Sequence, residues 1–203
     1  MIEHYPFQKF KISAFQRAKK DKTCCGDSYF VKETDNYLIC AVADGLGSGI
    51  GAKEASQTAI ETIETNYNLP LDLLMDKVNR SLVRHRGAVV TIFKIDYEAK
   101  LVSFCGVGNV KLLIYPRFGK PISPLPKRGF LSGQPLRLQV QEFNYPDHAM
   151  FVLYSDGITL HANQVQTIQN MYHVVAEEGE SYLDRYVQLN SNDDLTLLIG
   201  KPL

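Results

Sequence analysis

Four short aspartate motifs border apolar runs in this chain. They are Gly26-Asp27, Asp44-Gly45, Asp156-Gly157 and Asp193-Asp194. The second and third follow runs that are typical of buried strands, and the first and fourth precede such runs. A carboxylate beside buried apolar residues is costly unless another charge compensates it. Several such carboxylates together predict a site for a hard divalent cation with oxygen ligands, such as Mg²⁺ or Mn²⁺.

Length and composition favour one globular domain spanning residues 1–203, with 45% hydrophobic and 22% charged residues. Lys plus Arg and Asp plus Glu each number 22, so the net charge is zero. We therefore expect no general attraction to nucleic acid or to an anionic membrane. A monomer is the default expectation for such a chain.

Several observations favour a cytoplasmic protein. No apolar stretch has the length of a membrane span, and the first residues lack the basic and apolar regions of a secretion signal. The cysteines do not match zinc-ligand spacing, so we expect reduced thiols. They are Cys24, Cys25, Cys40 and Cys105.

Apolar periodicity predicts strands, two helices, further strands, two more helices and a last strand. The expected strands are residues 7–15, 28–33, 37–43, 88–95, 101–107, 110–115, 138–143, 149–154 and 195–199. Four helices are expected. The first follows the glycine turn 45–51, the second starts at Pro70, and the last two cover 161–176 and 180–189. Short connections predict antiparallel pairing of 88–95 with 101–107 and of 101–107 with 110–115.

This order of elements predicts the α+β class, because the helices are grouped between runs of antiparallel strands. Eight to ten strands are too many for one open twisted sheet, so we expect two packed sheets. With a helix pair on each outer face, the fold is a four-layer α-β-β-α sandwich of two antiparallel sheets flanked by helix pairs.

The ordered motifs resemble those of the metal-dependent serine/threonine protein phosphatases, the PPM or type 2C family. The matching set is Gly26-Asp27, Asp44-Gly45 with Gly47, Gly108-Asn109, Asp156-Gly157, and Asp193-Asp194 followed by Thr196. The short length and the segment 42–49 resemble the bacterial SpoIIE-type branch, whose compact members act on phosphorylated stressosome proteins in the stress response. The resemblance implies the sandwich fold, two Mn²⁺ or Mg²⁺ ions, and a phosphorylated regulatory protein as substrate.

The resemblance also implies a role for each motif residue. Asp44 would bridge the two ions, and the Gly45 carbonyl would bind one of them. Asp156 and Asp193 would bind the second ion, and Asp27 would hold metal-bound water. In this family a metal-bridging hydroxide attacks the phosphomonoester, so Asp44 and Asp27 are the residues expected to support catalysis.

Two positions, Lys22 and Gly26, depart from the family pattern, and Asp194 ranks below the other carboxylates. Asp194 stands where relatives have Asp or Asn, so we rank it behind Asp193 as a ligand. Many relatives carry an arginine that grips phosphate where this chain has Lys22, a point charge in place of a bidentate fork. Gly26 replaces an acid, as in the bacterial branch.

The segment 99–141 contains seven basic residues and no acid, which argues against a third metal ion held there. It is either a solvated loop or a surface for an acidic or phosphorylated partner. In the second case Lys127 and Arg128, like Lys22, would contact the substrate.

Two other functions remain open at this point. Residues 47–52 fit a dinucleotide fingerprint after a strand, but Asp44 would repel a pyrophosphate and the βαβ order is missing. A non-catalytic binding module with a phosphatase fold is the second alternative. Measurement of metal-dependent phosphoserine hydrolysis separates that module from an enzyme.

Overall fold

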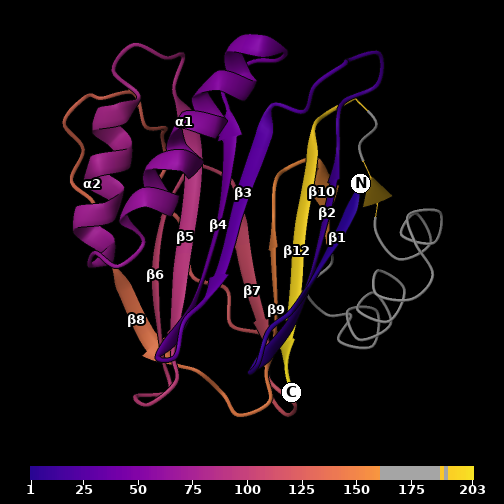
Figure 1. Cartoon of the computed structure of the whole chain (residues 1–203), viewed down its shortest axis with the longest axis vertical. Helices are drawn as coiled ribbons and strands as arrows, with labels where there is room; N and C mark the ends of the chain where they lie inside the picture. Colours follow the sequence, from indigo (N-terminus) through magenta and orange to yellow (C-terminus); the bar gives the residue numbers. More distant parts are fainter. Residues whose placement is uncertain (161–187, 190–191) are drawn as a thin grey trace.

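The computed structural model describes residues 1–160, 188–189 and 192–203, which form two five-stranded antiparallel sheets (Figure 1). The first sheet contains, in spatial order, β3 (Asp27–Glu33), β4 (Tyr37–Gly45), β5 (Ala88–Asp96), β6 (Leu101–Val107) and β8 (Gln141–Asn144). The second contains β1 (Ile2–Pro6), β2 (Phe10–Arg17), β12 (Leu195–Pro202), β9 (Met150–Tyr154) and β7 (Lys111–Tyr115). The prediction of two antiparallel sheets is confirmed.

Side-chain alternation along β4 shows how the layers pack. Successive residues of a strand point to opposite faces of the sheet. Leu38, Cys40 and Val42 lie in the core between the two sheets. Ile39, Ala41 and Ala43 instead pack in the core under the helices. An apolar run buried on both faces is therefore the middle layer of the molecule.

Helices α1 (Ile50–Asn66) and α2 (Leu71–Ser81) cover the outer face of the first sheet (Figure 1). Small buried residues of α1, among them Ala52, Ala55 and Ala59, allow the helix to approach the sheet closely. Helix α2 begins at Leu71, one residue later than predicted, with Pro70 as its N-cap, and has Asp72 in its first turn and Arg80 in its last. These charges complement the helix dipole.

The outer face of the second sheet is also apolar and buried, with Phe15, Val152 and Leu197 in one cluster. The helices predicted over 161–176 and 180–189 lie outside the described residues except at their end. There Gln188–Leu189 form β11, which pairs with β10 (Ile158–Thr159). The helix predicted through residue 189 is thus wrong at its last two residues, because backbone pairing overrides the local periodicity. The helix pair on the first sheet is confirmed.

The predicted pairing of 101–107 with 110–115 is wrong. Strand β6 stays in the first sheet, whereas β7 crosses to the second and pairs with β9. Gly108 makes this crossing with φ +107, and a Cβ there would lie 2.2 Å from Cγ1 of Val89. A three-residue connection that resembles a hairpin turn therefore joins the two sheets.

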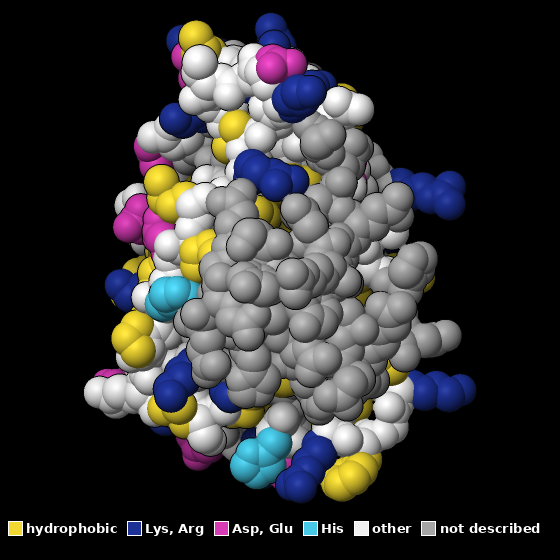
Figure 2. All heavy atoms as spheres, turned by 90° about the vertical axis from the view of Figure 1, so that its right-hand side faces the viewer, with side chains coloured by type: hydrophobic (Ala, Val, Ile, Leu, Met, Phe, Trp, Pro, Cys, Tyr) yellow, Lys and Arg dark blue, Asp and Glu magenta, His cyan; other side chains and the backbone are white. Residues whose placement is uncertain are grey.

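No helix among the described residues is long and apolar enough to cross a membrane. On the side that Figure 2 shows, the visible lysine and arginine side chains are scattered among uncharged and acidic groups.

Candidate metal centre

The four aspartate motifs meet at one end of the sandwich. Asp27 begins β3 and lies directly opposite Asp44 in the antiparallel register with β4. On the second sheet, the N–H of Ser155 donates to the Thr196 carbonyl over 3.0 Å, which joins the segment before Asp156 to the start of β12. Each sheet therefore brings two motifs to the same end.

Asp27 is buried without a hydrogen-bond partner. Its side chain is 3% exposed, and neither carboxylate oxygen makes a hydrogen bond in the structure. Buried polar groups are nearly always paired, so such a carboxylate is costly unless a positive charge compensates it. This is the strongest structural indication of a cation site in the described residues.

Burial raises the pKa of Asp27 to about 7. The hydroxyls of Ser155 and Thr196 lower this pKa in part, although neither reaches the geometry of a hydrogen bond. The negative charges of Asp194 and Asp156 raise it further. The carboxyl therefore lies between the sheets, within the electrostatic reach of the other motifs.

Asp44 continues the alternation of β4 and lies on the same face of the strand as the side chains that pack between the sheets. Burial raises its pKa to about 8. The largest charge contribution comes from Asp27, and the remaining ones come from Asp156, Asp193 and Asp194. Asp44 is thus the residue on which the charges of all the other motifs act.

Asp156 is held by a hydrogen bond from a neighbouring turn. Burial raises its pKa, and the negative charge of Asp193 adds to this effect. Asn109 Nδ2 donates to Asp156 Oδ2 over 2.6 Å, and Lys111 also favours the charged form. The turn that carries the chain between the sheets therefore orients one of the predicted ligands.

Asp193 and Asp194 differ in their surroundings. Asp194 is 6% exposed, and its Oδ1 accepts a hydrogen bond from the Lys19 N–H over 2.8 Å. Asp193 is half-buried, and its Oδ1 accepts from the Asp194 N–H over 3.0 Å. A Cβ at Gly26 would lie 2.7 Å from Asp194 Oδ2, so the glycine leaves space for this carboxylate.

Gly45 connects the site to α1 at very close range. A Cβ at this position would lie 1.9 Å from the carbonyl oxygen of Ala52, so only glycine fits between the end of β4 and the first turn of the helix. The Gly45 N–H donates to the Gly26 carbonyl over 3.2 Å, which joins two of the motifs through the backbone.

The donor set fits a hard divalent cation. All candidate side chains offer carboxylate oxygens, and their negative charges contribute to the raised pKa of Asp27, Asp44 and Asp156, while Asp27 lacks a hydrogen-bond partner. Among the described residues, no three His, Cys, Asp or Glu side chains are grouped closely enough to share one ion as they stand. The carboxylates face one another without forming a closed ligand shell.

The predicted substrate residues lie in two places. Lys22 is exposed, and its N–H donates to the Lys19 carbonyl in the loop before Asp27. Lys127 and Arg128 are also exposed, and the Lys127 backbone bonds to both Gly106 and Gly108. Asn109 follows Gly108 in the chain and donates a hydrogen bond to Asp156, so the segment around Lys127 is connected to the candidate site. The Lys127 ammonium donates to the Arg137 carbonyl over 2.7 Å, which leaves Arg128 as the more available charge.

Sequence reasoning missed the polar groups around Asp27. Gln16 Nε2 donates to the Asp27 carbonyl and to Thr196 Oγ1, each over 3.2 Å, from a strand of the other sheet. It also missed Arg86, whose Nε would lie 2.9 Å from a Cβ at Gly51, so the side chain rests on the start of α1. Neither residue belongs to a local motif, and only the tertiary structure brings them to this end.

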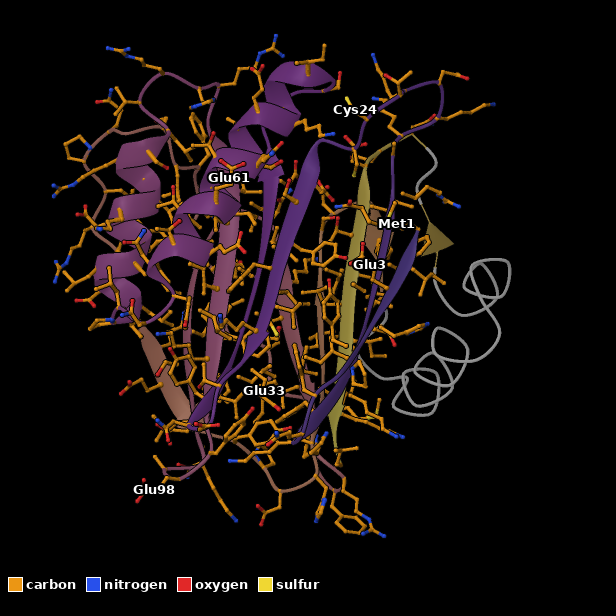
Figure 3. All side chains as sticks on the ribbon, viewed as in Figure 1. Met1, Glu3, Cys24, Glu33, Glu61 and Glu98 are labelled. Carbon is orange, nitrogen blue, oxygen red and sulfur yellow. The ribbon has the colours of Figure 1, made fainter. Side chains whose placement is uncertain are left out.

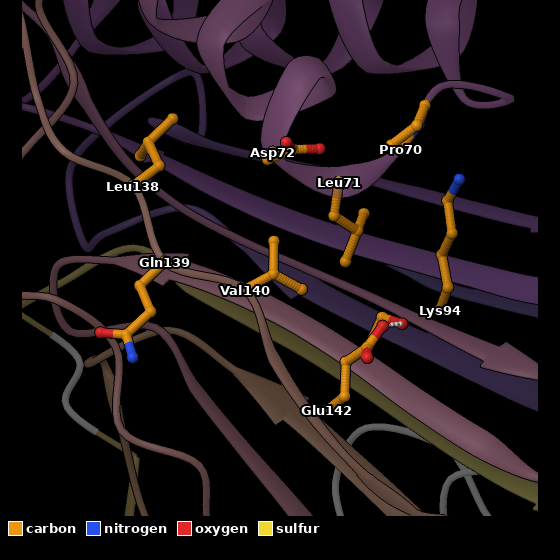
Figure 4. A pocket seen from close by; sticks show the side chains of 9 residues that line it. Pro70, Leu71, Asp72, Lys94, Leu138, Gln139, Val140 and Glu142 are labelled. Atoms are coloured by element: carbon orange, nitrogen blue, oxygen red, sulfur yellow. Dashed lines mark hydrogen bonds between the residues drawn. The ribbon is translucent and has the colours of Figure 1, made fainter.

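Two cavities differ in their relation to the carboxylates. A groove of about 890 Å³ between α1 and β1 reaches Asp27. A cavity of about 720 Å³ lies beside α2, is lined by Lys94, Asp72 and Glu142 among others, and contains none of the motif residues (Figure 4). Lys94 Nζ donates there to the Leu69 carbonyl, and burial lowers its pKa to about 8. Of these two cavities, the groove is the one lined by a residue of the candidate centre.

Comparisons with known proteins agree with this geometry. The family model for Stage II sporulation protein E (SpoIIE) matches residues 34–201. The phosphoserine phosphatase RsbX of Bacillus subtilis (strain 168) is 32% identical over 206 residues, covering 99% of each protein. A crystal structure of RsbX in complex with magnesium covers 100% of both chains, with a TM-score of 0.87 and 30% identity.

A further solved structure, from a study of the bacterial stressosome as a modular system, is 29% identical with a TM-score of 0.84. It covers 95% of this chain and 100% of that one. The family match and the full-length similarity to RsbX together show that the chain belongs to the SpoIIE family of PPM-type protein phosphatases.

Proposed function

We propose that this chain hydrolyses phosphoserine or phosphothreonine on a bacterial regulatory protein of the stressosome type, with two Mn²⁺ or Mg²⁺ ions. The observation that carries this is the buried, unpartnered carboxylate of Asp27 directly opposite Asp44. The similarity to RsbX, a phosphoserine phosphatase, supports the reaction class. The similarity to a structure from the stressosome study supports the class of partner.

In this proposal each motif residue has a separate role. Asp44 and the Gly45 carbonyl would hold one ion, and Asp44, Asp156 and Asp193 would hold the second. Bound divalent cations supply Lewis acidity that lowers the pKa of water and neutralises phosphate oxygens. Asp194 has one oxygen engaged by the Lys19 N–H, which suits a supporting role.

Asp27 is proposed to orient a water molecule through its two free oxygens. It lies opposite Asp44 in the strand register and close enough to the Ser155 and Thr196 hydroxyls for them to lower its pKa. Asn109, by contrast, holds Asp156 through a direct hydrogen bond. A hydrolysis of this kind needs no covalent intermediate on the protein, so no serine or cysteine nucleophile is invoked.

The direct test is phosphate release from phosphoserine and phosphothreonine peptides. We expect turnover with Mn²⁺ or Mg²⁺, complete loss with EDTA, and recovery when metal is restored. Calorimetry in parallel would report metal binding. Metal binding without turnover of any phosphopeptide would contradict the enzyme and favour the non-catalytic binding module.

The dinucleotide alternative finds no support in the described residues. Residues 47–52 do connect a strand to a helix, but β4 pairs antiparallel with both of its neighbours. A dinucleotide site needs parallel strands joined by a crossover helix. The acidic pair Asp27 and Asp44 also lies where a pyrophosphate would have to approach.

The basic segment near Asn109 gives a test of partner binding. The double replacement Lys127→Glu and Arg128→Glu is expected to raise KM on the phosphoprotein about threefold to tenfold, as for a few exposed charge pairs. Turnover of p-nitrophenyl phosphate should hardly change. Lys120→Glu is the matched control, because it is equally exposed and belongs to the same basic segment. Equal losses on both substrates would argue against a docking role.

A further inference from the structure

The groove that reaches Asp27 lies at the open edge of the sandwich. Helix α1 forms one wall, β1 and the end of β2 form the other, and β3 lies between them. Figure 3 shows Glu61 on α1 and Glu3 on β1, on opposite sides of β3. We call this space the α1–β1 groove. It is about 890 Å³ in volume, which is enough for several residues of an extended chain.

The charges of the groove are arranged along its length. Arg17, at the end of β2, and Lys53, in the first turn of α1, lie at the end near Asp27. The Met1 amino group donates to the Gln16 carbonyl at the same end. Glu61 and Glu64 lie two to three turns further along α1. The groove therefore carries basic side chains beside the aspartates of the candidate centre and acidic side chains further along α1.

The carboxylates of the negative end are held in place by neutral groups. The Tyr5 hydroxyl donates to Glu3 Oε2 over 2.7 Å, and Gln57 Nε2 donates to Glu61 Oε1 over 2.9 Å. Within the described part of the chain, no lysine or arginine forms an ion pair with Glu3, Glu61 or Glu64. All three acids are thus exposed, and Glu3 and Glu61 are also oriented by hydrogen bonds, which makes this end of the groove available to a cationic ligand.

We propose that the α1–β1 groove receives an extended segment of the phosphoprotein that carries a lysine or arginine a few residues from the phosphorylated side chain. This rests on the proposed function, and it adds a specificity to it. Lys53, at the end of the groove that Asp27 lines, suits the phosphate dianion. The negative end suits the basic side chain, and Glu61 and Glu64 are the residues that determine the preference.

The helix geometry sets the spacing. Glu61 lies eight residues beyond Lys53, a rise of about 12 Å along α1. An extended chain covers about 3.3 Å per residue, so the basic side chain is expected about three to five residues from the phosphoserine. The spacing can be tested on either side of the phosphoserine.

The test uses phosphoserine peptides with lysine, alanine or glutamate three to five residues before or after the phosphoserine. Binding is followed by fluorescence anisotropy and hydrolysis by phosphate release, with metal present. We expect the wild-type protein to favour one lysine peptide over its glutamate counterpart by about tenfold in Kd and in kcat/KM. The double replacement Glu61→Lys and Glu64→Lys should remove or reverse that preference.

Glu54→Lys is the matched control, because Glu54 is exposed on the same helix but does not line the groove. It should retain the wild-type preference, and both variants should hydrolyse p-nitrophenyl phosphate like wild type. Equal binding of lysine and glutamate peptides, or a preference that survives the double replacement, would overturn the proposal. Absence of all metal-dependent turnover would instead contradict the proposed function, while the binding measurements would still decide the role of the groove.

Discussion

Replacement of Asp44 by asparagine is expected to lower kcat/KM on any phosphomonoester by on the order of 10³-fold or more. Asp44 is the residue on which the charges of Asp27, Asp156, Asp193 and Asp194 all act. An amide keeps the shape of the side chain but removes the charge that would hold two cations together. The loss should therefore appear equally on a phosphopeptide and on p-nitrophenyl phosphate.

The same replacement should abolish stabilisation by metal. A ligand at 100 times its Kd stabilises the folded state by about 2.7 kcal/mol, so Mn²⁺ should raise the Tm of the wild-type protein and leave Asp44→Asn almost unchanged. Asp35→Asn is the control, because Asp35 is exposed in the turn at the opposite end of the same β3–β4 hairpin. Full activity of Asp44→Asn with Mn²⁺ would exclude Asp44 as the bridging ligand.

Local patterns in the sequence were enough to predict most of the first sheet. The alternation in β4 and the helical spacing of Ala52, Ala55 and Ala59 each depend on burial within one element, which a single sequence displays. The connection at Gly108 was misinterpreted because a tight turn with positive φ serves a hairpin and a crossing between sheets equally well. Pairing between distant strands decides between these two uses.

The residues of the candidate site likewise fall into two groups, those that the sequence could predict and those that it could not. Asp27 and Asp44 could be named from the sequence because each stands beside an apolar run, and their opposition follows from the hairpin register. Gln16 and Ser155 could not, because they reach Asp27 from the other sheet through contacts between residues far apart in the sequence. The distribution of charges in the α1–β1 groove could not be predicted either, because the groove is formed by β1 and α1, which are far apart in the sequence.

The buried carboxyls also predict an unusual pH dependence for the metal-free protein. Folding raises the pKa of Asp27 to about 7 and that of Asp44 to about 8, from an ordinary value near 3.8. Between about pH 4 and pH 8 the folded state therefore binds more protons than the unfolded state. By linkage, the free energy of unfolding must fall as the pH rises through this window. The stabilisation is fully present below the unfolded pKa and is lost as these carboxyls ionise.

The expected loss between pH 5.5 and pH 8 is on the order of 3 kcal/mol in EDTA, measured as the free energy of urea unfolding. Saturating Mn²⁺ should reverse the slope, because the cation competes with protons for the same carboxylates and binds more tightly as the pH rises. Asp44→Asn should flatten the slope in EDTA, whereas Asp35→Asn should keep it. If the metal-free protein were as stable at pH 8 as at pH 5.5, the two carboxyls would be charged at both pH values, and the electrostatic argument for a cation between them would fail.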